Sequence, residues 1–161
     1  MKKIILLIIM LLALNFIAYS SISKNTQVSK TTNNTLNTTI YLPNIEDGCL
    51  DSQDLTINKL TPNILFNELK NNNIITENTN LISFDTYIKN NENIGVINFS
   101  KEFYSFNLGS LGELLMLNSI AKTFIVNFDL DKFKILIEGK EYESGHVSFR
   151  ENEYFTLDFI D

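Results

Sequence analysis

Residues 110–127, SLGELLMLNSIAKTFIVN, carry the strongest structural signal in this chain. Apolar residues recur there at steps of three, three, one and three, which places them along one stripe of a helix. The stripe consists of Leu114, Leu117, Ile120, Ala121 and Phe124, and it is widened by Leu115, Met116 and Ile125. We therefore expect a heavily buried helix that ends around Asn127.

Ser110 and Glu113 begin this helix with the spacing of a capping box. In that arrangement the serine hydroxyl accepts a hydrogen bond from the amide three residues on, and the glutamate carboxylate accepts one from the serine amide. A catalytic role for the pair is the alternative, but capping explains both residues without it. Gly109 and Gly112 do not form a phosphate-binding loop, because no Lys-Ser or Lys-Thr pair follows them.

A shorter helix and a hairpin are expected upstream. Thr61 has the character of an N-cap and Pro62 that of a first helical residue. The apolar face of this helix consists of Ile64, Leu65, Phe66 and Leu69. Residues 81–89 and 94–99 are typical of two hairpin arms joined by a turn at 90–93. Gly95 marks a bulge or close packing. In the first arm, one face carries Ile82, Phe84, Thr86 and Ile88.

Further extended segments complete the predicted fold. Strands are expected at residues 39–43, 55–57 and 133–138, and shorter extended pieces at 146–149 and 154–159. The order strand, helix, hairpin, helix, strand predicts an α/β fold of the α+β two-layer kind. We expect a small mixed sheet with two helices on one face, in the order β-α-β-β-α-β.

The N-terminal part of the chain differs from the rest. Residues 1–20 combine a basic start, an apolar run of 15 residues and small residues before Ser21, which predicts a signal peptide, with an uncleaved membrane anchor as the alternative. Residues 21–38 are nearly all Ser, Thr, Asn, Lys and Gln, so we expect a polar flexible linker. The globular domain is predicted to span residues 39–161. Cys49 lies too far along the chain to be a lipid-attachment site.

The chain is acidic, with a net charge of −6 at pH 7. Because an acidic surface does not collect phosphates, nucleic acid is not an expected partner. Cys49 is the only cysteine and is expected to be a partly buried small residue, with an intermolecular disulfide as the alternative. Glu46, Asp47, Asp51 and Asp54 lack the spacing of a calcium-binding loop, so we interpret them as a solvated acidic loop.

His146 is the only histidine. As a base it would need a nucleophile and an orienting group, and as a metal ligand it would need companions. The sequence offers no nucleophile motif, second histidine or cysteine pair. We therefore expect no catalytic residue, metal or cofactor, and interpret His146 as a polar residue that holds a turn through a backbone hydrogen bond.

An ordered set of features runs from the hairpin to the end of the last core strand. A strand ends in a serine followed by an acidic and an aromatic residue, a Gly-Ser pair begins a helix with an acidic residue three positions on, and a Gly-His pair follows a strand and its glycine turn. These features occupy Ser100, Gly109, Ser110, Glu113, Thr123, Gly139, Gly145 and His146. The set resembles the GerMN domain family, and the resemblance covers about residues 39–150.

The resemblance implies an exported, non-catalytic binding or assembly module of Gram-positive bacteria that acts in sporulation or spore germination. It implies a fold similar to the ring-building motifs of secretion systems and an envelope protein as the binding partner. It is also compatible with a homo-oligomer. An uncleaved signal would add membrane association. A small-ligand sensor and a cell-wall hydrolase remain the alternatives. The aromatic residues before the long helix are the predicted interface: Phe103, Tyr104 and Phe106.

Overall fold

The computed structural model describes residues 35–160. The expected signal sequence, and the expected linker as far as residue 34, lie outside the described residues. The elements follow one another in the order β1 (Leu36–Asn44), β2 (Cys49–Ile57), α2 (Pro62–Asn71), β3 (Leu81–Lys89), β4 (Glu92–Phe99), the 3-10 helix η1 (Lys101–Ser105), α3 (Ser110–Phe128), β5 (Lys132–Ile137), β6 (Lys140–Glu141) and α4 (Leu157–Ile160).

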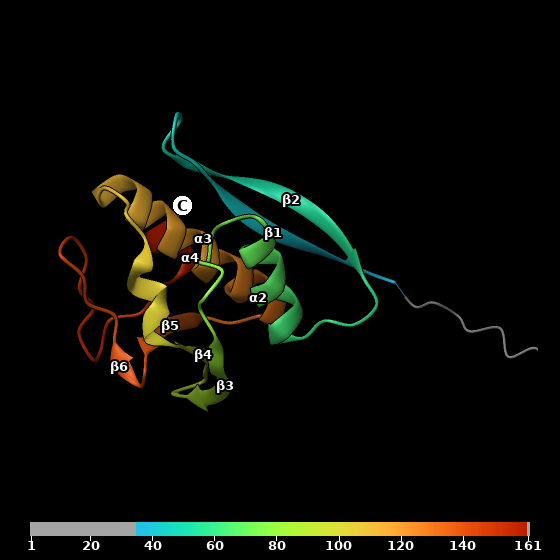
Figure 1. Ribbon diagram of the computed structural model, residues 1–161. Coiled ribbons are helices and arrows are strands. Elements are labelled where there is room, and N and C mark those ends of the chain that lie inside the picture. Colours follow the sequence, from blue (N-terminus) through green and yellow to red (C-terminus); the bar gives the residue numbers. More distant parts are fainter. Residues whose placement is uncertain (1–34, 161) are drawn as a thin grey trace, which may run out of the picture. The chain divides into compact units, whose positions relative to one another are not determined.

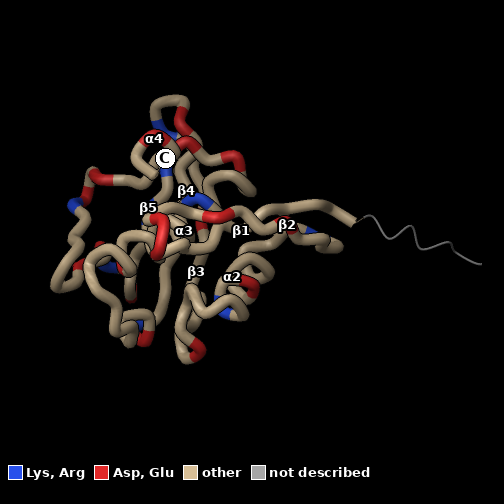
Figure 2. Tube along the Cα trace, turned by 90° about the horizontal axis from the view of Figure 1, so that it is seen from above, with Lys and Arg blue, Asp and Glu red and all other residues tan. Residues whose placement is uncertain are grey.

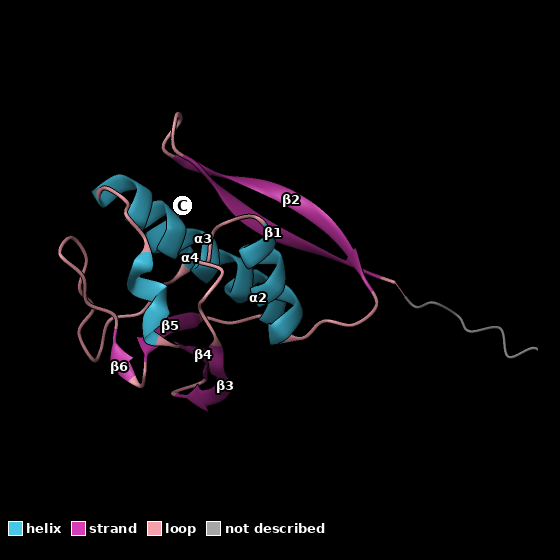
Figure 3. Ribbon diagram, viewed as in Figure 1, coloured by secondary structure: helices cyan, strands magenta, loops and turns pink. Residues whose placement is uncertain are grey.

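The strands form two separate sheets (Figure 3). β1 and β2 pair as an antiparallel hairpin, and the other four strands form a mixed sheet in the order β3-β4-β5-β6, in which β4 and β5 are parallel. The predicted α/β class and mixed sheet are confirmed. The first strand, however, belongs to the hairpin and not to the mixed sheet.

The hairpin is also longer than expected. β1 begins at Leu36, three residues before the predicted start at Thr39, so residues 36–38 belong to a strand and not to the linker. The segment 55–57, expected as a short strand, is the end of the longer β2. The acidic residues Asp51 and Asp54 therefore lie on a strand, and the predicted acidic loop is confined to the turn between the strands.

Helices α2 and α3 lie between the hairpin and the mixed sheet (Figure 1). On the sheet side, Phe66 of α2 stacks on Phe99 of β4 at 5.8 Å between ring centroids, and Phe124 of α3 stacks on Phe133 of β5 at 5.5 Å. The parallel register pairs Phe99 with Ile137 and Gly95 with Phe133, so both rings of the sheet belong to one face. The expected placement of two helices on one face of the sheet is thus supported by these contacts.

The heavy burial predicted for α3 follows from this position between two layers. Eleven of its residues are buried, because a helix that is apolar around most of its circumference must be covered on more than one side. It ends at Phe128, one residue later than predicted, and Asp129 follows in the left-handed conformation with φ 52°. The expected N-cap of α2 is confirmed, since the Thr61 hydroxyl accepts a hydrogen bond from the Ile64 N–H at 3.3 Å.

The predicted β3–β4 hairpin is confirmed, with Asn90 and Asn91 at φ 54° and 64° in its turn. Positive φ at both positions matches the twist of a two-residue hairpin. Of the predicted face of β3, Phe84 packs on Phe124 and Phe128 of α3 at 5.2 and 4.8 Å between ring centroids. Ile82 and Ile88, in contrast, are 52% and 77% exposed. The register shifts between residues 81 and 83, which interrupts the alternation of faces, and Ile88 lies next to the turn.

The structure also tests the predictions made for Gly95 and for the extended piece 154–159. A Cβ atom at Gly95 would lie 2.5 Å from Leu130 Cδ1, so this glycine marks close packing, as one of its two interpretations proposed. The predicted extended piece 154–159 is wrong over its second half, because Phe155 alone bridges to Phe133 and residues 157–160 form α4.

Among residues 35–160, no helix combines the length and apolar character needed to cross a membrane.

Side chains of α3 pair with the backbone edge of β1. The Tyr41 N–H donates to Thr123 Oγ1 at 3.0 Å, and the Tyr41 carbonyl accepts from the Ser119 hydroxyl. Asn127 Nδ2 donates to the Thr39 carbonyl at 2.7 Å. Ser119, Thr123 and Asn127 are four residues apart and therefore share one face of the helix. This polar row joins the hairpin to the helix and satisfies backbone groups that would otherwise be unpaired.

We expect Thr123→Val to destabilise the protein, because it keeps the shape of the side chain but removes the acceptor of the Tyr41 N–H. A buried donor without a partner costs about 1–3 kcal/mol, and the loss should appear as a lower free energy of unfolding in urea denaturation. Thr123→Ser keeps the hydroxyl and is the control. Equal losses in the two variants would contradict a role for this hydrogen bond.

Candidate functional site

An apolar groove of about 210 Å³ lies where the hairpin turn meets the beginning of α3. Four segments supply its lining: the end of β1 with the hairpin turn, the turn after α2, the segment that leads into α3, and the first turns of α3 itself. The lining residues are Pro43, Ile45, Asn73, Ile74, Phe106, Leu108, Gly112 and Met116. Such a concave apolar surface is suited to receiving an apolar side chain.

The hairpin turn holds Ile45 beside this groove. The Asn44 side-chain amide donates to the carboxylates of Asp47 at 3.0 Å and Asp51 at 3.1 Å, and its oxygen accepts from the Asp47 N–H at 3.1 Å. Gly48 completes the turn with φ 67°. Ile45 is 59% exposed, and although a single exposed isoleucine means little on a protein surface, this one lines an apolar hollow.

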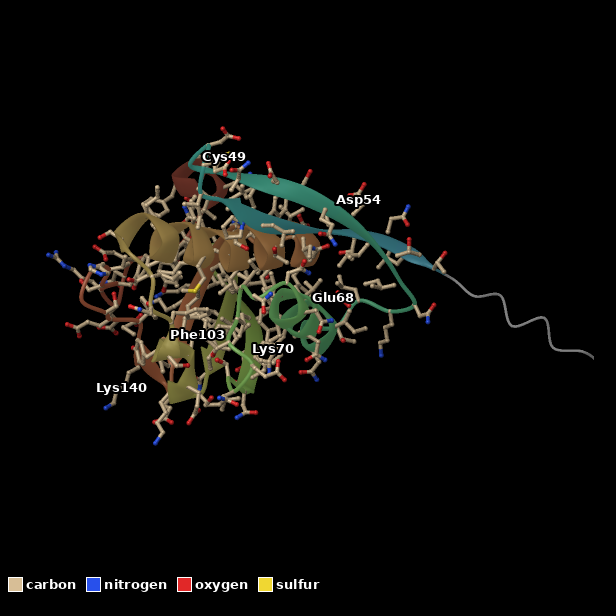
Figure 4. All side chains as sticks on the ribbon, turned by 45° about the horizontal axis from the view of Figure 1, so that its top comes forward. Cys49, Asp54, Glu68, Lys70, Phe103 and Lys140 are labelled. Carbon is tan, nitrogen blue, oxygen red and sulfur yellow. The ribbon has the colours of Figure 1, made fainter. Side chains whose placement is uncertain are left out.

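Aromatic packing positions the other side of the groove. Phe103 is completely buried and stacks on Phe99 at 4.9 Å between ring centroids. Phe106 meets the Phe103 ring edge-on at 5.6 Å and lines the groove. The prediction of Phe103 as an interface residue is wrong, because its side chain is part of the core (Figure 4). Tyr104 is 43% exposed, and the interface role of Tyr104 and Phe106 stays a prediction.

The predicted capping box is wrong. Gly109 is the N-cap of α3 and no side chain caps it, so Ser110 is the first helical residue. Glu113 is therefore the fourth helical residue and not the third, and its side chain turns inward, where its Oε1 accepts a hydrogen bond from the Tyr142 O–H at 2.5 Å. Phe103 and Tyr104 both contact the Tyr142 ring, at 5.9 and 5.5 Å between centroids.

We expect the contribution of Tyr142 to stability to depend on pH. Burial, and then the hydrogen bond and charge of Glu113, raise the pKa of Tyr142 above its usual value of about 10. Because the folded-state pKa is the higher one, the stabilisation is complete below about pH 10 and is lost as the pH rises further. Urea denaturation at pH 8 should show that Tyr142→Phe costs about 1.5–3 kcal/mol, and the difference from wild type should shrink above pH ~10.

Tyr104→Phe is the matched control for this prediction, because its ring stacks on Tyr142 but its hydroxyl makes only a 3.4 Å contact with the Glu143 N–H. This variant should keep the wild-type dependence of stability on pH. A constant difference between wild type and Tyr142→Phe from pH ~8 to pH ~11 would contradict the predicted linkage.

Other positions that carry the family resemblance have structural roles. Ser100 Oγ accepts from the Asn80 N–H at 3.0 Å, and Thr123 binds the backbone of β1. Gly139 adopts φ 77° in the turn after β5, and its N–H donates to Asn98 Oδ1 at 2.9 Å. These residues hold the fold in place and are not brought together in the groove.

Gly145 and His146 lie in an exposed turn at residues 144–147. The His146 N–H donates to Ser144 Oγ at 3.1 Å, so the backbone of His146, and not its ring, takes part in the turn.

Within residues 35–160 no three His, Cys, Asp or Glu side chains are grouped as metal ligands. Cys49 is exposed, so the expectation of a partly buried residue is wrong.

Two wider hollows lie elsewhere. One, of about 460 Å³, is lined by Glu138, Glu141 and Glu143 together with Lys101 and Lys140. Of these carboxylates, Glu141 is paired with the Lys134 ammonium at 2.8 Å. The other, of about 540 Å³, lies along the C-terminal segment from residue 147 to 159.

Sequence reasoning found Phe106 but missed the groove residues Pro43, Ile45 and Ile74. One signal was present, because Ile45 is the only large apolar residue in the polar run 44–48. An isolated apolar residue on a surface does not by itself indicate an interface, so this signal gains meaning only from the groove beside Ile45. Ile74 gave no comparable signal, since apolar residues after a helix usually enter the core.

The two sheets and the helices between them define a small α/β domain. The model of the Germane family, described as sporulation and spore germination, matches residues 39–143, and the chain belongs to this family. The resemblance inferred from the sequence is thereby confirmed. A comparison with curated protein sequences finds no match.

Solved structures with a similar fold include the following three. A "Putative Lipoprotein" from Clostridium perfringens is 22% identical with a TM-score of 0.50, and the match covers 78% of this chain and 90% of that one. The first GerMN domain of the sporulation protein GerM from Bacillus subtilis is 18% identical with a TM-score of 0.52, covering 77% of this chain and 99% of that one. The tandem GerMN domains of the same protein are 19% identical with a TM-score of 0.53, and the match covers 74% of this chain and 46% of that one.

Proposed function

We propose that this protein is a non-catalytic binding module of the cell envelope that acts in sporulation or spore germination. Its groove beside Ile45 receives an apolar side chain of an envelope protein. Membership of the Germane family supports the process, and the signal-like residues 1–20 support export.

The observation that carries the binding role is the composition of the groove. Ile45 supplies an exposed apolar rim, and Phe106, which sequence reasoning had already placed at an interface, supplies part of the wall. Interfaces draw their binding energy from a few apolar and aromatic residues that fit a pocket on the partner. The groove offers such a pocket and the exposed isoleucine offers a side chain to insert.

The use of the polar residues supports a non-catalytic role. The Ser100, Glu113 and Thr123 side chains are each engaged in a hydrogen bond that stabilises the fold. A nucleophile or general base must instead be within reach of a substrate and of its catalytic partner. These side chains stabilise loops, the aromatic cluster and the hairpin.

A fusion to a reporter that fluoresces after export tests the proposal in sporulating cells. The wild-type fusion should accumulate at the forespore envelope. Ile45→Glu places a charge at the groove, which an apolar partner side chain cannot accommodate, and should disperse that signal. Ile88→Glu is the matched control, because Ile88 is also an exposed isoleucine in the β3–β4 hairpin and does not line the groove.

The two parts of the proposal can fail separately. An even distribution of the wild-type fusion would contradict the envelope function. Wild-type localisation that Ile45→Glu leaves unchanged, at equal protein level, would contradict the role of the groove.

A further inference from the structure

The edge of β2 is free in the described fold. β2 pairs with β1 on one side, and no other strand within residues 35–160 pairs with it on the other side. Figure 1 shows β2 on the outer side of the hairpin, with β1 between β2 and the helices. A free edge presents unpaired backbone N–H and C=O groups that can bind an extended segment of another chain.

The hydrogen bonds of β1 determine which groups of β2 point outward. Both backbone groups of Tyr41 bind α3, so Tyr41 directs them away from β2. Directly opposed residues of an antiparallel pair either exchange hydrogen bonds or both point away. Ser52 lies opposite Tyr41, and Asp54 lies opposite Thr39, whose carbonyl also binds α3. The outward row is therefore Leu50, Ser52, Asp54 and Thr56.

This edge has only one of the usual protections against pairing, the charge of Asp51 and Asp54. Natural edge strands are shortened, bulged, interrupted by proline, or carry charged side chains, lysine above all. β2 is nine residues long, pairs with β1 without a register shift, and contains neither proline nor lysine. β3, which is also at an edge, has a register shift at its beginning and Lys89 at its end. The difference marks the β2 edge as a surface for pairing.

The charge around the edge selects the kind of strand that can pair with it. Residues 44–58 contain four acidic residues and no lysine or arginine. Asp51 and Asp54 are exposed on the strand itself (Figure 4 labels Asp54). One oxygen of each carboxylate accepts a hydrogen bond within the hairpin, from Asn44 at 3.1 Å and from the Thr39 hydroxyl at 2.9 Å. Figure 2 shows acidic positions along this hairpin. A second copy paired on this edge would bring acidic side chains of two β2 strands together, which is unfavourable.

We propose that the β2 edge binds an extended basic segment of the partner protein as a third strand of the hairpin. Backbone hydrogen bonds from Leu50, Ser52, Asp54 and Thr56 supply the affinity, and the Asp51 and Asp54 carboxylates select lysine or arginine. This inference rests on the binding function proposed above and names the chemistry of the partner, at a surface separate from the groove.

A synthetic peptide as long as β2, which alternates lysine with valine and threonine, is the probe. Titration into the ¹⁵N-labelled protein should shift the four outward amides and slow their hydrogen exchange, while the inward amide of Gln53 changes little. A peptide with glutamate in place of every lysine should bind at least about tenfold more weakly, because like charges across an interface oppose association.

Ser52→Pro tests the edge directly. It removes one outward N–H without removing a hydrogen bond to β1, a position where an edge strand tolerates proline. It should weaken binding of the lysine peptide about fivefold or more, as expected for loss of one hydrogen bond. Ser52→Thr keeps the N–H and should bind as wild type. Asp51→Asn with Asp54→Asn provides a second test, and should weaken binding and reduce its salt dependence.

Three results would each overturn the inference: equal affinity for the lysine and glutamate peptides, no protection of the four outward amides, or a dimer in sedimentation that Ser52→Pro dissociates. The proposed function is tested separately by the reporter fusion. If Ile45→Glu still disperses the fusion from the envelope, any of these three results overturns only the edge-binding inference. The opposite pattern, peptide binding at the edge with no envelope localisation, would contradict the proposed function alone.

Discussion

The fold depends on the need to pair the backbone edge of β1. That edge faces a helix and not another strand, so the partners must be side chains, and Ser119, Thr123 and Asn127 supply them at the helical spacing of four. This contact sets the position of the hairpin along α3. It brings the turn around Ile45 to the beginning of α3, where the groove forms, and it leaves β2 as the outer strand.

Much of the architecture could be predicted from local patterns. The apolar spacing of α3, the Thr61-Pro62 start of α2 and the asparagine turn of the β3–β4 hairpin each specify an element through short-range physics. The pairing of the first strand could not be predicted in this way. Nothing local to residues 36–44 distinguishes a strand of the mixed sheet from one that pairs with β2, because the choice is made by distant polar residues on α3.

The candidate site shows the same limit at the level of single residues. The register of a helix end decides the role of Glu113: one position earlier in the helix it would cap the backbone, but as the fourth helical residue it turns inward to Tyr142. The identity of Phe103 as core and Phe106 as groove wall depends on which ring fits against Phe99. Ile45 becomes meaningful only when the hairpin places it beside Phe106.

The stacked pair of Tyr104 and Tyr142 has an optical consequence. The chain contains no tryptophan, so its intrinsic emission comes from tyrosine and is not masked by a stronger emitter. A tyrosine whose hydroxyl is bonded to a carboxylate, as Tyr142 is to Glu113, emits weakly, and its neighbour Tyr104 stacks on it next to Phe106. Tyr104 and Tyr142 are two of the six tyrosines in the chain, so loss of the aromatic cluster behind the groove changes part of the tyrosine emission.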